Sequence, residues 1–124
     1  MKDCKGKVLI VDDEPVICKL LAHLVEKEGF TPLTAPDAKV ALGIMAEESL
    51  DVLLTDIMMP DISGIDLLKQ VRVMNPDLPV VMITAYADIP GAVEAIKLGA
   101  YDYLSKPFQN AEVISVINRA IRER

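Results

Sequence analysis

Five short apolar runs, rich in β-branched or aliphatic residues, are separated along the chain by segments with helical periodicity. The clearest runs are residues 8–11, 52–55 and 79–84, and weaker ones lie at residues 31–35 and 102–105. Continuous apolar runs of this length are typical of strands that are buried on both faces. Because each connection between parallel strands crosses a face of the sheet, strands alternating with helices predict a parallel sheet.

The segments between these runs have the start, spacing and stop signals of helices. Pro15 suits the first turn of a helix that ends at Gly29, and Asp37 is suited to cap the next one. Residues 89–98, closed by Gly99, and residues 109–122 are expected to form the fourth and fifth helices. The apolar positions of the first three helices are Val16, Ile17, Leu20, Leu21, Leu24 and Val25, then Val40, Ala41, Ile44 and Met45, then Ile65, Leu67, Leu68, Val71 and Val73. We therefore expect an α/β fold, a doubly wound (βα)5 domain whose five-stranded parallel sheet carries helices on both faces.

Length and composition fit one globular domain over residues 1–124. Of the 124 residues, 52% are hydrophobic and 26% charged, and the formal net charge is −6. This charge and the absence of a basic run disfavour direct binding to nucleic acid or to an anionic membrane. No apolar stretch reaches the roughly 18 residues that span a bilayer, and Cys4 and Cys18 have no disulfide or CxxC spacing. We expect a soluble, cytoplasmic protein without direct nucleic-acid or membrane contact.

Polar side chains stand where the predicted strands end. Asp12 and Asp13 follow the first strand, and Asp56 follows the third. Thr84 ends the fourth strand, and Lys106 follows the fifth. Ligands of open α/β sheets bind at the carboxyl ends of the strands, so these five groups are expected to converge. Three neighbouring carboxylates repel one another unless a cation compensates them, and hard oxygen ligands favour Mg²⁺.

Taken singly, each of these residues has an ordinary structural explanation. An acidic pair after a strand commonly caps a helix, a threonine hydroxyl commonly bonds the local backbone, and a lysine such as Lys106 is commonly solvated. His23, the only histidine, is expected on the surface of the first helix. The coincidence of polar groups at successive strand ends is what indicates a site.

The motifs at these positions resemble those of a known family. Residues 8–14, Asp56 with Pro60 and Gly64, residues 83–85, Gly99 with Ala100, and residues 103–108, which end in Lys106-Pro107-Phe108, are similar to the receiver domains of two-component response regulators. The resemblance extends from residue 8 to the last predicted helix and implies the flavodoxin-like order of a receiver sheet.

The resemblance implies a phosphoacceptor and a metal site. Asp56 would accept the phosphoryl group, and Asp13 and Asp56 would bind Mg²⁺ directly. Asp12 would assist, typically through water, and the backbone carbonyl of Met58 would complete the protein's share of the metal ligands. A chain of this kind is not expected to catalyse an independent turnover reaction.

The resemblance also implies a switch. Thr84 and Lys106 would hold the phosphoryl oxygens, and the peptide bond between Lys106 and Pro107 would be cis. Thr84 would move toward the phosphoryl group and Tyr103 would rotate into the space behind it. The surface of the fourth helix, fifth strand and fifth helix would then change for a partner to recognise.

The expected partners follow from the same resemblance. A sensor histidine kinase or a phosphotransfer protein would supply the phosphoryl group, and phosphorylation would favour a homodimer. Residues 85–103 are similar to receivers of the NtrC type, which precede an ATPase module and a DNA-binding domain. The chain is thus either a stand-alone receiver or the receiver portion of a longer regulator with a covalently linked output domain.

Two other functions of similar folds are less well supported. A phosphatase of the haloacid-dehalogenase type uses an Asp-x-Asp motif, whereas Asp56 is followed by Ile57 and Met58. A flavodoxin-like electron carrier needs a hydroxyl-rich first loop for the FMN phosphate, whereas the acidic residues 12–14 would repel it. A nucleotide-binding P-loop is excluded because no GxxxxGK[ST] motif is present.

Overall fold

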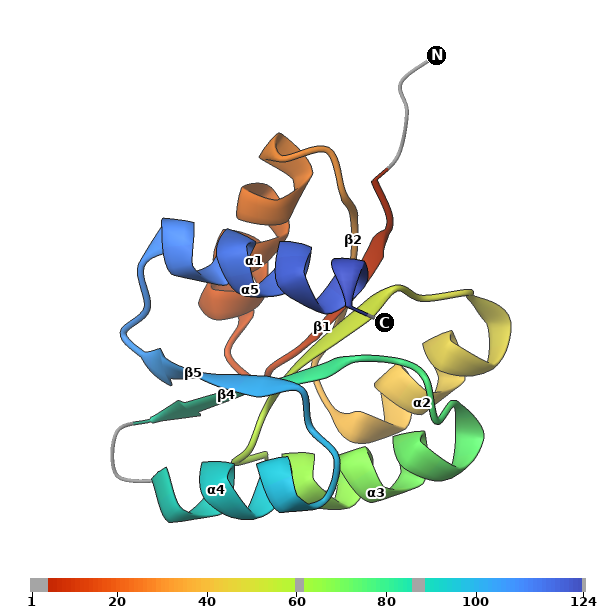
Figure 1. Cartoon of the computed structure of the whole chain (residues 1–124). Coiled ribbons are helices and arrows are strands. Elements are labelled where there is room, and N and C mark those ends of the chain that lie inside the picture. The colour runs from red at the N-terminus through yellow and green to blue at the C-terminus, as the bar shows by residue number, and fades with distance from the viewer. Residues whose placement is uncertain (1–4, 60–61, 86–88, 124) are drawn as a thin grey trace.

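A computed structural model describes residues 5–59, 62–85 and 89–123 of the chain. Five parallel strands form one sheet in the order β2-β1-β3-β4-β5 (Figure 1). The strands are β1 (Lys7–Val11), β2 (Thr31–Ala35), β3 (Val52–Asp56), β4 (Val80–Ala85) and β5 (Asp102–Lys106). The helices are α1 (Pro15–Lys27), α2 (Ala38–Glu47), α3 (Gly64–Met74), α4 (Ile89–Lys97) and α5 (Asn110–Arg122). The predicted doubly wound (βα)5 fold is confirmed.

The helices cover both faces of the sheet and bury a separate core on each. Helices α1 and α5 lie on one face, and α2, α3 and α4 lie on the other (Figure 1). Along β1, Val8 and Ile10 pack toward α1 and α5, whereas Leu9 and Val11 pack toward the opposite helices. Because both faces of the strand are buried, its sequence is continuously apolar rather than alternating.

Local signals for the ends of the helices act as predicted. Pro15 stands in the first turn of α1, where its missing amide proton is not needed. The carboxylate of Asp37 accepts a hydrogen bond of 2.9 Å from the amide of Val40 and caps α2. Gly29 and Gly99 follow α1 and α4 with φ values of 98° and 109°, a conformation that favours glycine.

The expected apolar faces were wrong at four positions. The exposed residues are Val16 (75%), Leu20 (45%), Val40 (42%) and Val73 (83%). Successive helical residues are about 100° apart, so Val73 lies about 200° around α3 from the buried Val71. On α1 the buried positions are Cys18, Leu21 and Val25, so the free thiol of Cys18 belongs to the core.

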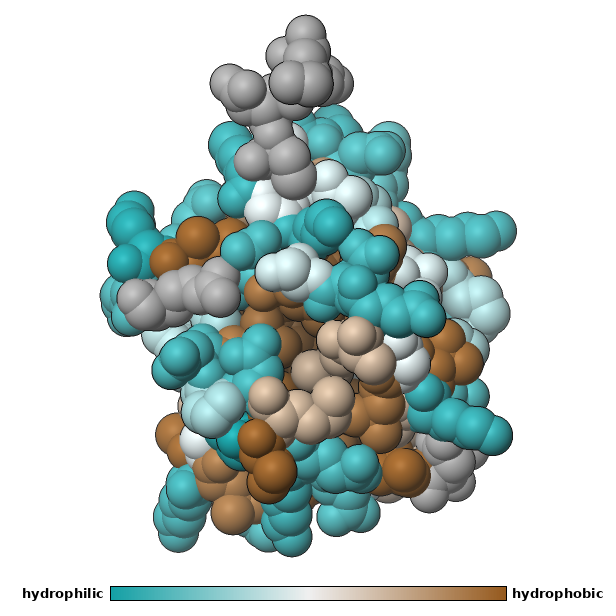
Figure 2. Space-filling view, turned by 90° about the vertical axis from the view of Figure 1, so that its right-hand side faces the viewer, coloured by the Kyte–Doolittle hydropathy of each residue, from teal (hydrophilic) through white to brown (hydrophobic). Residues whose placement is uncertain are grey.

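The strand order places a crevice at one edge of the sheet. After β1 the chain passes to the α1 face, and after β3 it passes to the α3 face, although β1 and β3 are neighbours. The two loops therefore separate at the carboxyl ends of these strands. Figure 2 shows the side on which α2 and α3 end, where hydrophobic surface is surrounded by hydrophilic residues. A pocket of about 100 Å³ between those helix ends is lined by residues that include Met45, Leu50, Met74 and Leu78.

No helix in the described ranges combines the length and the apolar character needed to cross a membrane. His23 is exposed on α1, as predicted. Cys4, the loop residue Pro60 and residues 86–88 before α4 lie outside the described residues.

Candidate functional site

The acidic residues after β1 and at the end of β3 meet at the crevice. In the sheet register Val11 pairs with Thr55, so Asp12 and Asp56 stand at the same level on neighbouring strands. One ligand oxygen each from Asp12, Asp13 and Asp56 lies within 4.8 Å of the others. The register of two parallel strands thus brings together carboxylates that are more than 40 residues apart in sequence.

Asp12 is the most buried of these carboxylates, with 1% of its surface exposed. Its Oδ1 accepts a hydrogen bond of 2.9 Å from the amide of Glu14, and its Oδ2 accepts one of 3.1 Å from Lys106. Burial raises the pKa of Asp12, and the nearby Asp56 also raises it, whereas the two hydrogen bonds act in the opposite direction. The negative charge of Asp12 is therefore costly in the folded protein unless a cation compensates it.

Both carboxylate oxygens of Asp56 accept a hydrogen bond. It is 6% exposed, its Oδ1 accepts from the amide of Met58 at 3.2 Å, and its Oδ2 accepts from Lys106 at 3.1 Å. The backbone is held as well, because the hydroxyl of Thr55 donates to the Asp56 carbonyl and a Cβ at Gly64 would collide with that carbonyl. Asp56 thus presents its carboxylate to the crevice from a tightly packed strand end.

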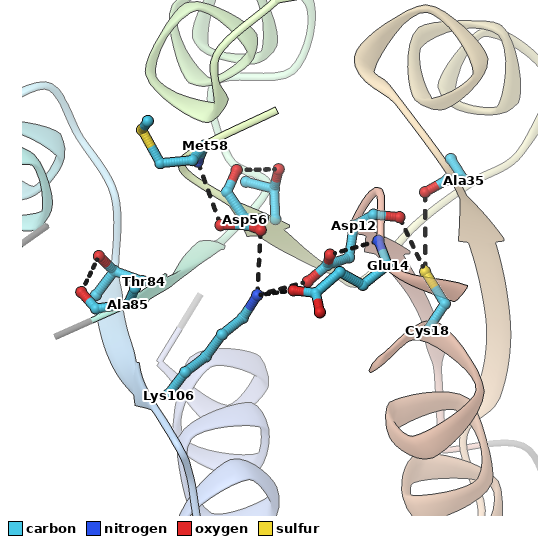
Figure 3. A network of polar contacts seen from close by, with 10 residues as sticks. Asp12, Glu14, Cys18, Ala35, Asp56, Met58, Thr84, Ala85 and Lys106 are labelled. Carbon is cyan, nitrogen blue, oxygen red and sulfur yellow. Dashed lines mark hydrogen bonds and ion pairs between the residues drawn. The ribbon is translucent and has the colours of Figure 1, made fainter. Parts of the chain in front are cut away.

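Lys106 reaches across the crevice from the end of β5 (Figure 3). Its Nζ lies 3.1 Å from Asp12 Oδ2, 3.1 Å from Asp56 Oδ2 and 3.3 Å from Glu14 Oε1. Burial disfavours the charged ammonium, but the hydrogen bonds to Asp12 and Asp56 outweigh it and raise the pKa of Lys106. The expected cis peptide bond between Lys106 and Pro107 is present. Lys106 is therefore a cation fixed among carboxylates rather than a solvated surface charge.

Thr84 and Tyr103 lie on the neighbouring strands β4 and β5. Thr84 is fully buried, and its hydroxyl donates a hydrogen bond of 3.0 Å to the carbonyl of Ala85. This is the local backbone bond that is ordinary for a threonine at a strand end. Tyr103 is half-buried and packs against the core on the α2, α3 and α4 face. The structure thus places Thr84 beside the site, with its hydroxyl on the Ala85 carbonyl, and Tyr103 on the neighbouring strand opposite Met82, two residues before Thr84.

Two contacts of the site were not anticipated from the sequence. Glu14 was expected only as part of an acidic loop, yet its carboxylate reaches Lys106. The thiol of Cys18 lies within 3.3 Å of the backbone carbonyl of Asp12, to which it donates. Neither contact follows from a sequence signal. The contact of Glu14 depends on how β5 is placed beside the loop after β1, and the contact of Cys18 depends on how α1 packs against that loop.

The ligand set fits a hard divalent cation. The three clustered groups Asp12, Asp13 and Asp56 offer only oxygen atoms, which suit Mg²⁺ or Ca²⁺ and not zinc or copper. Asp13 is exposed while the other two are buried, so the cluster is open to solvent on one side. Burial, and to a lesser degree the charge of Asp56, raise the pKa of Asp12, and a cation there would compensate both carboxylates.

A doubly wound sheet with an acidic first loop, an aspartate at the end of β3 and a lysine at the end of β5 defines a signalling domain of the receiver class. Residues 8–118 match the family model of the response regulator receiver domain, and the chain belongs to this family.

Relatives and solved structures agree with this assignment. The chain is 42% identical over 94% of its length to the DNA-binding transcriptional regulator NtrC of Proteus hauseri, but spans only a quarter of that protein. A receiver domain protein from Clostridium thermocellum is 36% identical with a TM-score of 0.92, and 95% of each chain is covered. The receiver domain of NtrX from Brucella abortus is 37% identical with a TM-score of 0.91, covering 94% of this chain and 99% of that one. The chain is thus similar to receivers of NtrC-type regulators.

Proposed function

We propose that Asp56 accepts a phosphoryl group in a reaction that requires Mg²⁺. The observation that carries this proposal is the position of the Asp56 carboxylate, which clusters with those of Asp12 and Asp13 and is 3.1 Å from the Lys106 ammonium. Asp13 and Asp56 would hold the ion directly, Asp12 through water, and the carbonyl of Met58 would complete the set. The bound ion would neutralise charge on the carboxylates and on the phosphoryl oxygens.

The transfer requires an accessible carboxylate oxygen and compensation of the phosphoryl charge. An Asp56 oxygen attacks phosphorus, the new P–O bond forms as the P–N bond of a phosphohistidine donor breaks, and the leaving imidazole takes up a proton. Lys106 would turn its ammonium from the carboxylates to a phosphoryl oxygen. Thr84 would exchange its bond to the Ala85 carbonyl for a second phosphoryl oxygen.

This exchange is also the proposed origin of the switch. Movement of Thr84 would leave space that Tyr103 rotates to fill, which would alter the surface formed by α4, β5 and α5. The phosphoryl donor is a sensor histidine kinase or a phosphotransfer protein, and the altered surface favours a homodimer. Light scattering with beryllofluoride, which mimics the phosphoryl group, would show a larger species if this face pairs, and an unchanged monomer would refute the pairing.

The chain corresponds to only part of the regulators that it resembles. It spans a quarter of the NtrC of Proteus hauseri. We assign to this chain the role of receiver in a cytoplasmic regulator of transcription, which acts either as a stand-alone receiver through protein contacts or through a covalently linked output domain. The receiver itself is assigned no independent turnover reaction.

Intact-mass spectrometry tests the assignment of Asp56. Acetyl phosphate with millimolar Mg²⁺ should add one phosphoryl mass to the wild-type chain, and excess chelator should prevent the addition. Asp56→Asn should abolish the added phosphoryl mass. Asp51→Asn should leave the added mass unchanged, because Asp51 directly precedes β3 at the end opposite Asp56. Equal phosphorylation of the Asp56→Asn variant would refute the assignment. Sustained turnover of p-nitrophenyl phosphate would favour a phosphatase instead.

A further inference from the structure

The carboxylate of Glu14 stands apart from the acidic cluster but shares its lysine. Glu14 is not among the three residues whose oxygens cluster within 4.8 Å, yet its Oε1 lies 3.3 Å from Lys106 Nζ. Its side chain is 61% exposed, whereas those of Asp12 and Asp56 are 0% and 9% exposed. Glu14 is therefore the most exposed partner of Lys106, and it lies outside the carboxylate cluster.

The backbone holds Glu14 in place for this contact. Its amide donates to Asp12 Oδ1 at 2.9 Å, which fixes the residue at the start of α1. Glu14 is the N-cap residue of α1, but its side chain makes no capping hydrogen bond to the helix. The carboxylate is thus not used by the helix, and it turns toward Lys106 across the mouth of the crevice (Figure 3).

An ammonium group has three hydrogens, and Lys106 faces three carboxylates. A phosphoryl oxygen can gain a hydrogen bond from Lys106 only if one carboxylate gives it up. A cation among Asp12, Asp13 and Asp56 would repel the ammonium and weaken its contacts with Asp12 and Asp56. Glu14 would then remain as the anion that competes with the incoming phosphoryl group.

We propose that Glu14 is a positioning residue that restrains Lys106 and thereby slows phosphorylation of Asp56. This inference rests on the proposed phosphoacceptor function and assigns a regulatory contact to the same site. Removal of the Glu14 charge frees the ammonium to meet the phosphoryl oxygens. Since exposed ion pairs are weak, the expected gain in rate is only about two- to fivefold.

The first readout needs neither metal nor phosphate. In chelator, trace labelling with isotopic acetic anhydride and peptide mass spectrometry reports how reactive each lysine amine is. Glu14→Gln should raise the labelling of Lys106 about twofold relative to Lys7 in the same molecule. As a matched control, Glu48→Gln removes the carboxylate 2.8 Å from Lys7 Nζ and should raise the labelling of Lys7 alone. Unchanged labelling of Lys106 in Glu14→Gln would overturn the proposal.

The second readout is the rate of phosphorylation by subsaturating acetyl phosphate in Mg²⁺. Glu14→Gln should accelerate it about two- to fivefold, and the gain should vanish when Lys106→Met is present in both proteins. Glu112→Gln removes an exposed charge in the first turn of α5 and should change little. If Glu14→Gln accelerated phosphorylation equally in the Lys106→Met background, or did not accelerate it at all, the proposed role of Glu14 would be overturned. Asp56 would remain the acceptor. If the wild-type chain were not phosphorylated, both the phosphoacceptor function of Asp56 and the proposed role of Glu14 would be overturned.

Discussion

Lys106 should stabilise the metal-free fold because it is the cation nearest two buried carboxylates. Lys106→Met keeps most of the side-chain volume but leaves Asp12 and Asp56, whose side chains are 0% and 9% exposed, without their partner. A hydrogen bond to a charged group contributes roughly 1.5–3 kcal/mol, whereas the exposed contact with Glu14 contributes less than about 1 kcal/mol. The two hydrogen bonds share one donor, so their contributions to stability are not additive. We therefore expect a loss of about 3 kcal/mol in the free energy of unfolding.

Urea unfolding followed by far-ultraviolet circular dichroism measures this loss, since the chain has no tryptophan. In chelator, Lys106→Met should also lower the melting temperature by about 10 °C. In millimolar Mg²⁺ the ion compensates the same carboxylates, so the deficit should shrink to less than about 1 kcal/mol. As a control, Lys7→Met breaks a half-exposed pair with Glu48 and should cost less than about 1 kcal/mol. A deficit of the same size with and without Mg²⁺ would refute the reasoning.

The pH dependence of this deficit follows from Asp12. Burial raises the pKa of Asp12, so its carboxylate destabilises the fold above that pKa, and stability is regained as the pH falls through it. Loss of Lys106 removes an influence that lowers this pKa, so the pKa of Asp12 should rise further in the variant. The deficit of metal-free Lys106→Met should therefore be largest near about pH 8 and smaller near about pH 5.

Two pairs of variants test the packing at the site and on the helices. Gly64→Ala places a Cβ against the carbonyl of Asp56 and should cost about 2 kcal/mol and slow phosphorylation, as measured by urea unfolding and intact mass. Gly43→Ala, which has open space around it in α2, should instead stabilise by up to about 1 kcal/mol, and equal effects of the two would contradict this account. Val71→Ala should cost about 2 kcal/mol, whereas Val73→Ala should change stability by less than about 0.5 kcal/mol, because the first side chain is buried and the second exposed.

The sequence alone determined the order and type of the secondary elements. Apolar runs as continuous as residues 52–55 can be accommodated only where both faces of a strand are covered, and Pro15, Gly29 and Gly99 mark helix ends through backbone geometry that is local to each residue. The strand-end rule also placed Asp12 and Asp56 at one edge, because the carboxyl ends of parallel strands coincide. Family resemblance supplied the chemical roles, which spacing alone left open.

Tertiary structure decided which side chains touch and which faces are buried. Val73 was misjudged because an apolar residue on a helix is buried only if its direction meets the sheet, and direction depends on how the helix is docked. The contact of Glu14 with Lys106 joins residues 92 positions apart, and no local pattern encodes it. The burial that raises the pKa of Asp12 likewise arises only when the elements around it are packed together, since desolvation is a property of the assembled fold.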